Sequence, residues 1–240
     1  MRKLLLPLLV ATTFTSPTLL AADFSESVKQ AMSSDIRTER DTKRDRNRKP
    51  VETLEFFGIK DDMKVLEIIP GGGWYTKLLA PALKDNGQLY LSLGTDYIKD
   101  KLLKNDQFDK VKLVGPKDYE MENLDFDVKG VDAVLTFRNY HNFKEDSRTN
   151  INKAAFKALK PGGIYGVVDH TRRHMQKNND ENGRRFDPVL AIKEIQAAGF
   201  VFVDYSDLHY KSDDELRYDV GRKTVSGNSD RFTLMFKKPE

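Results

Sequence analysis

The side chains best suited to catalysis in this sequence are two histidines, His141 and His170. Each of them follows an apolar run that predicts a β-strand, at residues 131–137 and 164–168. A neutral imidazole is the natural general base near pH 7. We therefore expect His141 and His170 to be catalytic residues, and the alternative is the structural role that histidines beside aromatic residues more often have.

A turn of three consecutive glycines joins another predicted strand to an amphipathic helix. The strand, residues 65–69, contains one acid, Glu67, and the helix begins at Trp74. Glycines have no Cβ atoms, so a ligand can approach the backbone N–H groups and the positive end of the helix. The pattern indicates a site for a nucleotide-like ligand, and a tight connection without a ligand is the alternative. The glycines are Gly71, Gly72 and Gly73.

The residues after the glycines narrow the kind of ligand. A phosphate-binding P-loop requires Lys followed by Ser or Thr, but Trp74 and Tyr75 follow here, which excludes it. A dinucleotide-binding G-x-G-x-x-G pattern would begin at Gly71, but Thr76 replaces its third glycine. That glycine permits close packing of the helix on the strand, so an NAD-linked oxidoreductase is disfavoured.

Strands alternate with helices along the chain, which predicts a predominantly parallel sheet with helices on both faces. Seven strands are expected at 65–69, 88–93, 111–114, 131–137, 164–168, 200–203 and 231–236. Helices are expected at 25–32, at 50–59, from 74 onward, and at 96–108, 151–160 and 188–198. Ligands of such sheets bind at the carboxyl ends of the strands, so the glycine turn, residues 138–141 and residues 169–170 should share one rim.

Charged residues gather in two stretches of the chain. The arm, residues 35–49, contains RTERDTKRDRNRK at 37–49, with seven basic and three acidic residues. Such a run is most often a solvated helix face or a mobile arm. The alternative is an arm that folds over the ligand, with its arginines facing an anionic group. A second set would suit an acidic acceptor if its members converged: Arg172, Arg173, Arg184 and Arg185.

Several motifs resemble those of class I S-adenosylmethionine-dependent methyltransferases, most closely a group of exported bacterial proteins known as predicted methyltransferases. The resemblance covers nearly all of residues 35–238. It is carried by FFGI at 56–59, EIIPGGGWYT at 67–76, TFRNYHNF at 136–143 and LKPGG at 159–163. It implies a doubly wound, Rossmann-like α/β fold whose seven-stranded, mostly parallel sheet has the order 3-2-1-4-5-7-6, with strand 7 antiparallel.

The resemblance also implies S-adenosylmethionine as the cofactor and assigns roles around it. The glycine turn would wrap the methionine part of the cofactor, and Glu67 would help to hold its amino group. Asp96 would bind the ribose hydroxyls, and Asp118 would lie near the adenine. Asn139 and His141 would face the transferable methyl group.

The first 22 residues have the pattern of a secretory signal peptide. A basic start precedes an apolar run at 4–10, and the segment ends in small residues. We expect cleavage after Ala21 or Ala22, which leaves a single methyltransferase-like domain at 23–240 that is periplasmic or secreted. The apolar run is too short for a lasting membrane helix.

Charge and composition narrow the partners. Loss of Arg2 and Lys3 with the signal peptide lowers the net charge from +3 to about +1 (3 − 2), which gives no general attraction to nucleic acid or anionic membranes. The sequence contains no cysteine, which excludes lipid-anchored lipoproteins, thiol nucleophiles and cysteine-ligated metals. No metal site is expected.

These features together predict methyl transfer to a small molecule or an envelope component. The alternative is a non-catalytic exported binding module that keeps the methyltransferase fold for another ligand. Glu67 and the glycine run favour the enzyme, whereas the lack of an acid directly after the second strand favours the module. The sequence specifies neither the acceptor nor an oligomeric state.

Overall fold

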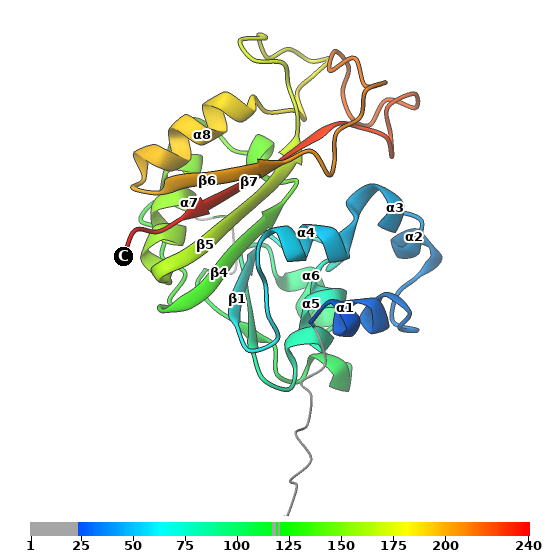
Figure 1. Ribbon diagram of the computed structural model, residues 1–240, viewed down its shortest axis with the longest axis vertical. Helices are drawn as coiled ribbons and strands as arrows, with labels where there is room; N and C mark the ends of the chain where they lie inside the picture. Colours follow the sequence, from blue (N-terminus) through cyan, green and yellow to red (C-terminus); the bar gives the residue numbers. More distant parts are fainter. Residues whose placement is uncertain (1–23, 117–118, 120) are drawn as a thin grey trace, which may run out of the picture.

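A computed structural model describes residues 24–116, 119 and 121–240 (Figure 1). The predicted signal peptide and Asp118 lie outside the described residues. The seven strands are β1 (Lys64–Ile68), β2 (Gln88–Ser92), β3 (Lys112–Leu113), β4 (Val131–Phe137), β5 (Leu159–His170), β6 (Val201–Ser206) and β7 (Arg231–Lys237). They form one sheet in the order β3-β2-β1-β4-β5-β7-β6, in which β7 is antiparallel to both its neighbours. The predicted fold class and strand order are confirmed.

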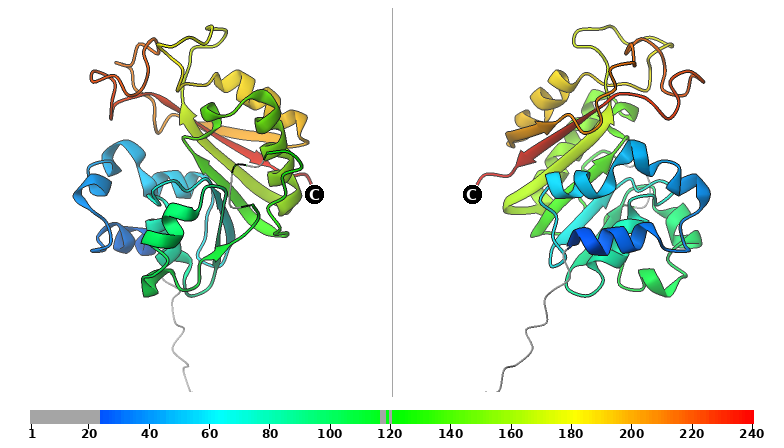
Figure 2. Two further views of the ribbon diagram at one scale, coloured as in Figure 1. Left: turned by 180° about the vertical axis from the view of Figure 1, so that it is seen from behind. Right: turned by 45° about the vertical axis from the view of Figure 1, so that its right-hand side comes forward.

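Helices cover both faces of this sheet (Figure 1 and Figure 2). One face packs against α1 (Phe24–Met32), α4 (Pro50–Phe56), α5 (Thr76–Leu83) and α6 (Asp96–Lys101), and the other against α7 (Glu145–Ala158) and α8 (Pro188–Ala197). Successive strand residues alternate between the faces, so Val65 and Leu66 are both fully buried, in different clusters. Because both faces of the sheet are covered, nearly every residue of the central strands is buried, and their sequences are continuous apolar runs.

Two helix starts follow from the capping residues of the sequence. Pro50 is the first residue of α4. A backbone N–H at this position makes no intrahelical hydrogen bond, so proline, which lacks one, is well accommodated there. The Asp187 side chain accepts hydrogen bonds from the backbone N–H groups of Val189 and Leu190 at the start of α8. Both helix starts were predicted and are confirmed.

Some elements differ from the prediction because of local geometry. The helix expected at 96–108 ends at Lys101, and a separate 3₁₀ turn (Asp106–Phe108) follows, because the Asn105 side chain accepts from the Gln107 N–H. The glycine turn continues through Tyr75, so α5 begins at Thr76 rather than at residue 74. Nearly all of α5 is buried, because α1 packs against it as well.

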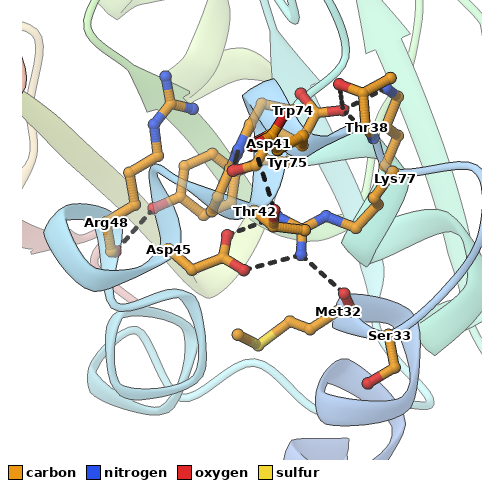
Figure 3. A network of polar contacts seen from close by, with 12 residues as sticks. Met32, Ser33, Thr38, Asp41, Thr42, Asp45, Arg48, Trp74, Tyr75 and Lys77 are labelled. Carbon is orange, nitrogen blue, oxygen red and sulfur yellow. Dashed lines mark hydrogen bonds and ion pairs between the residues drawn. The ribbon is translucent and has the colours of Figure 1, made fainter.

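The charged arm folds into two short helices, α2 (Glu39–Thr42) and α3 (Asp45–Arg48), and attaches to the helix after the glycine turn (Figure 3). Asp41 accepts a 2.7 Å hydrogen bond from Lys77, and its backbone carbonyl accepts one from the Trp74 ring at 3.0 Å. The Lys77–Asp41 ion pair is largely buried. The arm therefore packs against the residues that follow the glycine turn.

The described residues contain no helix that is both long enough and apolar enough to span a lipid bilayer.

We expect Asp41→Asn to release the arm. The change removes the charge from a buried ion pair, and breaking such a pair costs about 3–5 kcal/mol. Limited trypsin digestion should then cut residues 37–49 at least about tenfold faster than in the wild type. Glu39→Gln is the matched control, because its pair with Lys43 is exposed on the same helix. Equal cleavage rates in the two variants would contradict this role of Asp41.

Candidate functional site

Three neighbouring strands end in residues whose backbones are strained. Ile69, Leu93 and Arg138 follow β1, β2 and β4 directly and have φ angles of 57°, 62° and 65°. A non-glycine residue in the left-handed region costs about 1–3 kcal/mol and is often found where a site requires a particular chain path. Two of these residues are held by hydrogen bonds to the neighbouring strand. The Ile69 N–H donates to the Ser92 carbonyl at 2.9 Å, and the Arg138 N–H donates to the Val168 carbonyl at 2.7 Å.

The glycine turn leaves open space above the end of β1. A Cβ atom added to Gly71 or Gly72 would meet no atom within 4 Å. Gly73 differs, because a Cβ there would lie 2.4 Å from the Leu102 side chain. Gly73 therefore allows α6 and the turn after it to pack closely against the glycine turn. Gly71 and Gly72 instead form a cradle that faces a cavity.

Glu67 lies beneath this cradle and is 3% exposed. Its Oε2 accepts a 2.7 Å hydrogen bond from the Thr76 hydroxyl, and its Oε1 has no partner among the described residues. Burial raises the pKa of Glu67 to about 7, against the opposing effects of the Thr76 hydrogen bond and the Arg48 charge. Glu67 therefore changes its charge near neutral pH.

A cavity of about 280 Å³ lies between the glycine turn and the arm. Asp41, Arg44 and Arg48 of the arm line this cavity together with Glu67 and the glycine turn. The remaining lining includes Ile69, Pro70, Trp74, Tyr75, Phe137, Arg138 and Asn139. The arm thus folds over the site that the sequence predicted.

Aromatic and amide side chains fix the shape of this smaller cavity. The rings of Tyr75 and Phe137 are stacked with centroids 3.5 Å apart. The Asn139 amide donates to the backbone carbonyls of Ile69 (2.9 Å) and Phe137 (3.1 Å). Asn139 therefore ties the ends of β1 and β4 together while it lines the cavity.

A larger cavity of about 560 Å³ adjoins the first and shares Arg44, Arg48 and Arg138 with it. His170 and Arg231, from the sheet, also line this cavity. Its far wall comes from the loop 207–230, which extends beside the arm (Figure 1). The two cavities occupy the carboxyl-end rim, where ligands of such sheets bind.

His141 forms a pair with Asp169, at the end of β5. His141 Nδ1 lies 2.7 Å from the fully buried Asp169 carboxylate, which also accepts the His141 backbone N–H at 2.8 Å. A proton on Nδ1 donates to the carboxylate and leaves Nε2 as the basic nitrogen. His141 lines neither cavity, but its ring centroid lies 5.8 Å from that of His170, which does.

His170 is 2% exposed, and both of its ring nitrogens are engaged. Its Nε2 accepts from the Arg138 guanidinium at 3.1 Å, and its Nδ1 lies 2.9 Å from the Ser229 hydroxyl. Burial and the charges of Arg231 and Arg138 hold the pKa of His170 well below its ordinary value. His170 is therefore neutral and orients Arg138, and it can accept a proton only if a hydrogen bond breaks.

The structure does not bring every predicted site residue together. Asp96 is exposed at the start of α6 and lines neither cavity. Among the four arginines of the second charged set, Arg184 lines the larger cavity, whereas Arg185 is buried in an ion pair with Asp214. The four arginines thus do not converge on one group.

Several lining residues were not predicted as site residues. Arg138 directly follows β4, and this position after a predicted strand was the signal that placed it at the carboxyl-end rim. Arg48 was one of the arm's arginines, for which contact with an anionic group was the alternative to a solvated face. The contact between Asp169 and His141 joins two strand ends that the sequence alone does not pair.

Comparison with known proteins shows the fold of the chain. No protein-family model and no curated protein matches the sequence. A SAM-dependent methyltransferase from Aquifex aeolicus is similar in structure, with a TM-score of 0.59 and 16% identity over 89% of this chain and 97% of that chain. The glycopeptide N-methyltransferase MtfA, solved in complex with sinefungin, is also similar, with a TM-score of 0.53 and 14% identity. The match covers 80% of this chain and 86% of that chain. The chain therefore has the fold of class I SAM-dependent methyltransferases.

The fold does not determine the reaction. The [4+2]-cyclase SpnF is also similar, with a TM-score of 0.58 and 17% identity over 80% of each chain.

The raised pKa of Glu67 predicts a pH-dependent stability. The folded protein binds this proton more tightly than the unfolded chain, so the free energy of unfolding falls as pH rises from about 4.5 to about 7 and then levels off. The expected loss between pH 5 and pH 8 is roughly 2–3 kcal/mol.

Glu67→Gln should lack this loss, as measured by urea denaturation at both pH values. Glu52→Gln, an exposed change on α4, should keep the wild-type pH dependence. The same pH dependence in Glu67→Gln and the wild type would contradict the raised pKa.

Proposed function

We propose that this protein is a SAM-dependent methyltransferase that acts on a small molecule or an envelope component. The observation that carries the proposal is the open cradle of Gly71 and Gly72 above the buried Glu67 carboxyl group, at the end of the first strand of this fold. The similar structures, which are described as SAM-dependent or sinefungin-bound methyltransferases, support it.

The residues of the smaller cavity fit the amino-acid end of S-adenosylmethionine. Glu67 has a free carboxyl oxygen for the ammonium group, and binding that cation would favour the ionised form of Glu67. Arg44 and Arg48, which line the same cavity, suit the cofactor carboxylate. Gly71 and Gly72 leave room for the chain between these groups.

The cofactor supplies a methyl group that its sulfonium activates, so the protein must position the acceptor and take its proton where one is lost. We assign the base to His141, since the 2.7 Å contact between its Nδ1 and the Asp169 carboxylate orients the ring and leaves Nε2 to accept a proton. Asn139 holds the strand ends that frame the transfer site.

A non-catalytic binding module is the second candidate, and one observation favours it. Asp96 lies away from both cavities, so the described residues after β2 offer no acid to clamp a ribose. SpnF illustrates that this fold also serves other reactions.

Thermal unfolding of the purified protein with SAM or S-adenosylhomocysteine tests the proposal. Ligand at a hundred times its Kd should add about 2.7 kcal/mol, which raises the Tm by roughly 5–10 °C. Gly72→Ala should fold normally, because its Cβ meets nothing within 4 Å, but its methyl group fills the cradle and should reduce the shift.

Gly183→Ala, whose Cβ meets only Asn179 O at 3.5 Å, is the control and should keep the full shift. No shift with millimolar SAM or S-adenosylhomocysteine, in a folded wild-type protein, would refute the methyltransferase and leave the binding module.

Export is part of the same proposal. The basic start, short apolar run and small-residue end of residues 1–22 support a cleaved signal peptide and a periplasmic or secreted protein. N-terminal sequencing of protein expressed in bacteria should find a mature chain that begins at Ala22 or Asp23. A chain that still begins at Met1 in the cytoplasmic fraction would contradict export.

A further inference from the structure

Positive charge gathers in the larger cavity without matching negative charge. Eight basic side chains line this cavity, and no Asp or Glu does. Lys43 and Arg184 have acidic partners outside the lining, Glu39 and Asp219. The other six form no ion pair with any described residue: Arg40, Arg44, Arg46, Arg48, Arg138 and Arg231.

Two of these cations are buried, which makes the missing partner costly. Arg48 and Arg231 are 8% and 7% exposed. The Arg48 guanidinium lies over the Trp74 ring, 4.4 Å from its centroid, and the buried Arg231 Nε has no hydrogen-bond partner. Burial and the charge of Arg138 lower the pKa of Arg48 to about 9 and that of Arg231 to about 10. A bound anion would offset the cost of burying these charges.

The protein holds Arg48 and Arg231 in place through hydrogen bonds with neutral groups rather than through ion pairs. The Arg48 carbonyl accepts from Thr53 and from His209 Nε2, each at 3.0 Å. Arg231 donates to the Asn47 carbonyl at 2.6 Å, and the Asn47 side chain donates to the Gly227 carbonyl. The arm and the loop 207–230 are thus joined beside the cavity, as their closeness in Figure 2 illustrates. The positive charge is organised before a ligand arrives.

We propose that the larger cavity binds the methyl acceptor through a compact group with two or more negative charges, as in a phosphate monoester or a diphosphate. The identification of this anion as the acceptor rests on the proposed methyltransferase function, whereas the anion site itself does not. Guanidinium groups form paired, charge-assisted hydrogen bonds with phosphate oxygens. The cavity volume of about 560 Å³ lies within the range for small-molecule sites.

The position of the cavity suits an acceptor. Arg44, Arg48 and Arg138 belong to both cavities, so a ligand held in the larger one adjoins the cradle in the smaller one. His170 accepts a 3.1 Å hydrogen bond from the Arg138 guanidinium and so fixes its position. This contact gives the neutral His170 a positioning role beside the cluster of cations. An anion there would also lower the repulsion that the arginines exert on a cationic sulfonium.

Isothermal titration calorimetry of the full protein tests the anion site. Inorganic pyrophosphate is the probe, at constant ionic strength, with inorganic phosphate and citrate in parallel to separate a diphosphate, a single phosphate and a polycarboxylate. Pyrophosphate should bind, and its Kd should rise at least tenfold in Arg138→Gln and in Arg44→Gln. Arg44 is half-buried and makes no side-chain hydrogen bond within the described part of the chain, so Arg44→Gln should fold normally.

Arg173→Gln is the matched control, because Arg173 is exposed and lines neither cavity. The Kd of pyrophosphate in this variant should equal that of the wild type. An equal Kd in Arg44→Gln, Arg138→Gln and Arg173→Gln would overturn the site, as would the absence of pyrophosphate binding to folded wild-type protein. Tighter binding of citrate than of pyrophosphate would overturn the phosphate assignment.

Titration of SAM into the same protein separates this inference from the proposed function. Pyrophosphate binding without SAM binding supports the anion site and refutes its assignment to a methyl acceptor. SAM binding without pyrophosphate binding supports the methyltransferase and refutes the anion site. Binding of both supports the two proposals together.

Discussion

Attachment of the charged arm to the helix after the glycine turn is the contact on which both cavities depend. Asp41 is bound by Lys77 through its side chain and by Trp74 through its backbone. Arg44 and Arg48 follow it in the chain and line both cavities. Without this contact, the rim of the sheet would be an open surface, because the arm supplies one wall of each cavity.

The site combines two opposite electrostatic costs that a ligand can relieve. Glu67 is buried, so its carboxyl group resists ionisation, while Arg48 and Arg231 are buried as cations without carboxylate partners. A structure selected only for stability would pair or remove such groups. Glu67 lines only the smaller cavity and Arg231 only the larger one, while Arg48 lines both, as expected of a site that binds a cationic group and an anionic group side by side.

The mostly parallel sheet could be predicted from the sequence because strands alternate with helices along the chain, whereas the strand order and the antiparallel β7 were implied by the resemblance to methyltransferases. Glu67 and the glycines could also be predicted from the sequence, since the strand, turn and helix that position them are adjacent in the chain. Asp96 was assigned through the resemblance alone, and it lies at the start of α6, outside the lining of both cavities. The pair of His141 with Asp169 spans 28 residues and depends on how two strand ends pack, which local patterns do not specify.

The hydrogen bond from Arg231 to Asn47 joins residues 184 positions apart, near the two ends of the folded chain. The larger cavity therefore cannot exist until the last strand has joined the sheet, however early the arm has formed. Closing so long a loop carries a large entropic cost, which later contacts must recover. An anion that bridges the arm and the last strand would act as a non-covalent cross-link, so occupancy of the site and completion of folding are thermodynamically coupled.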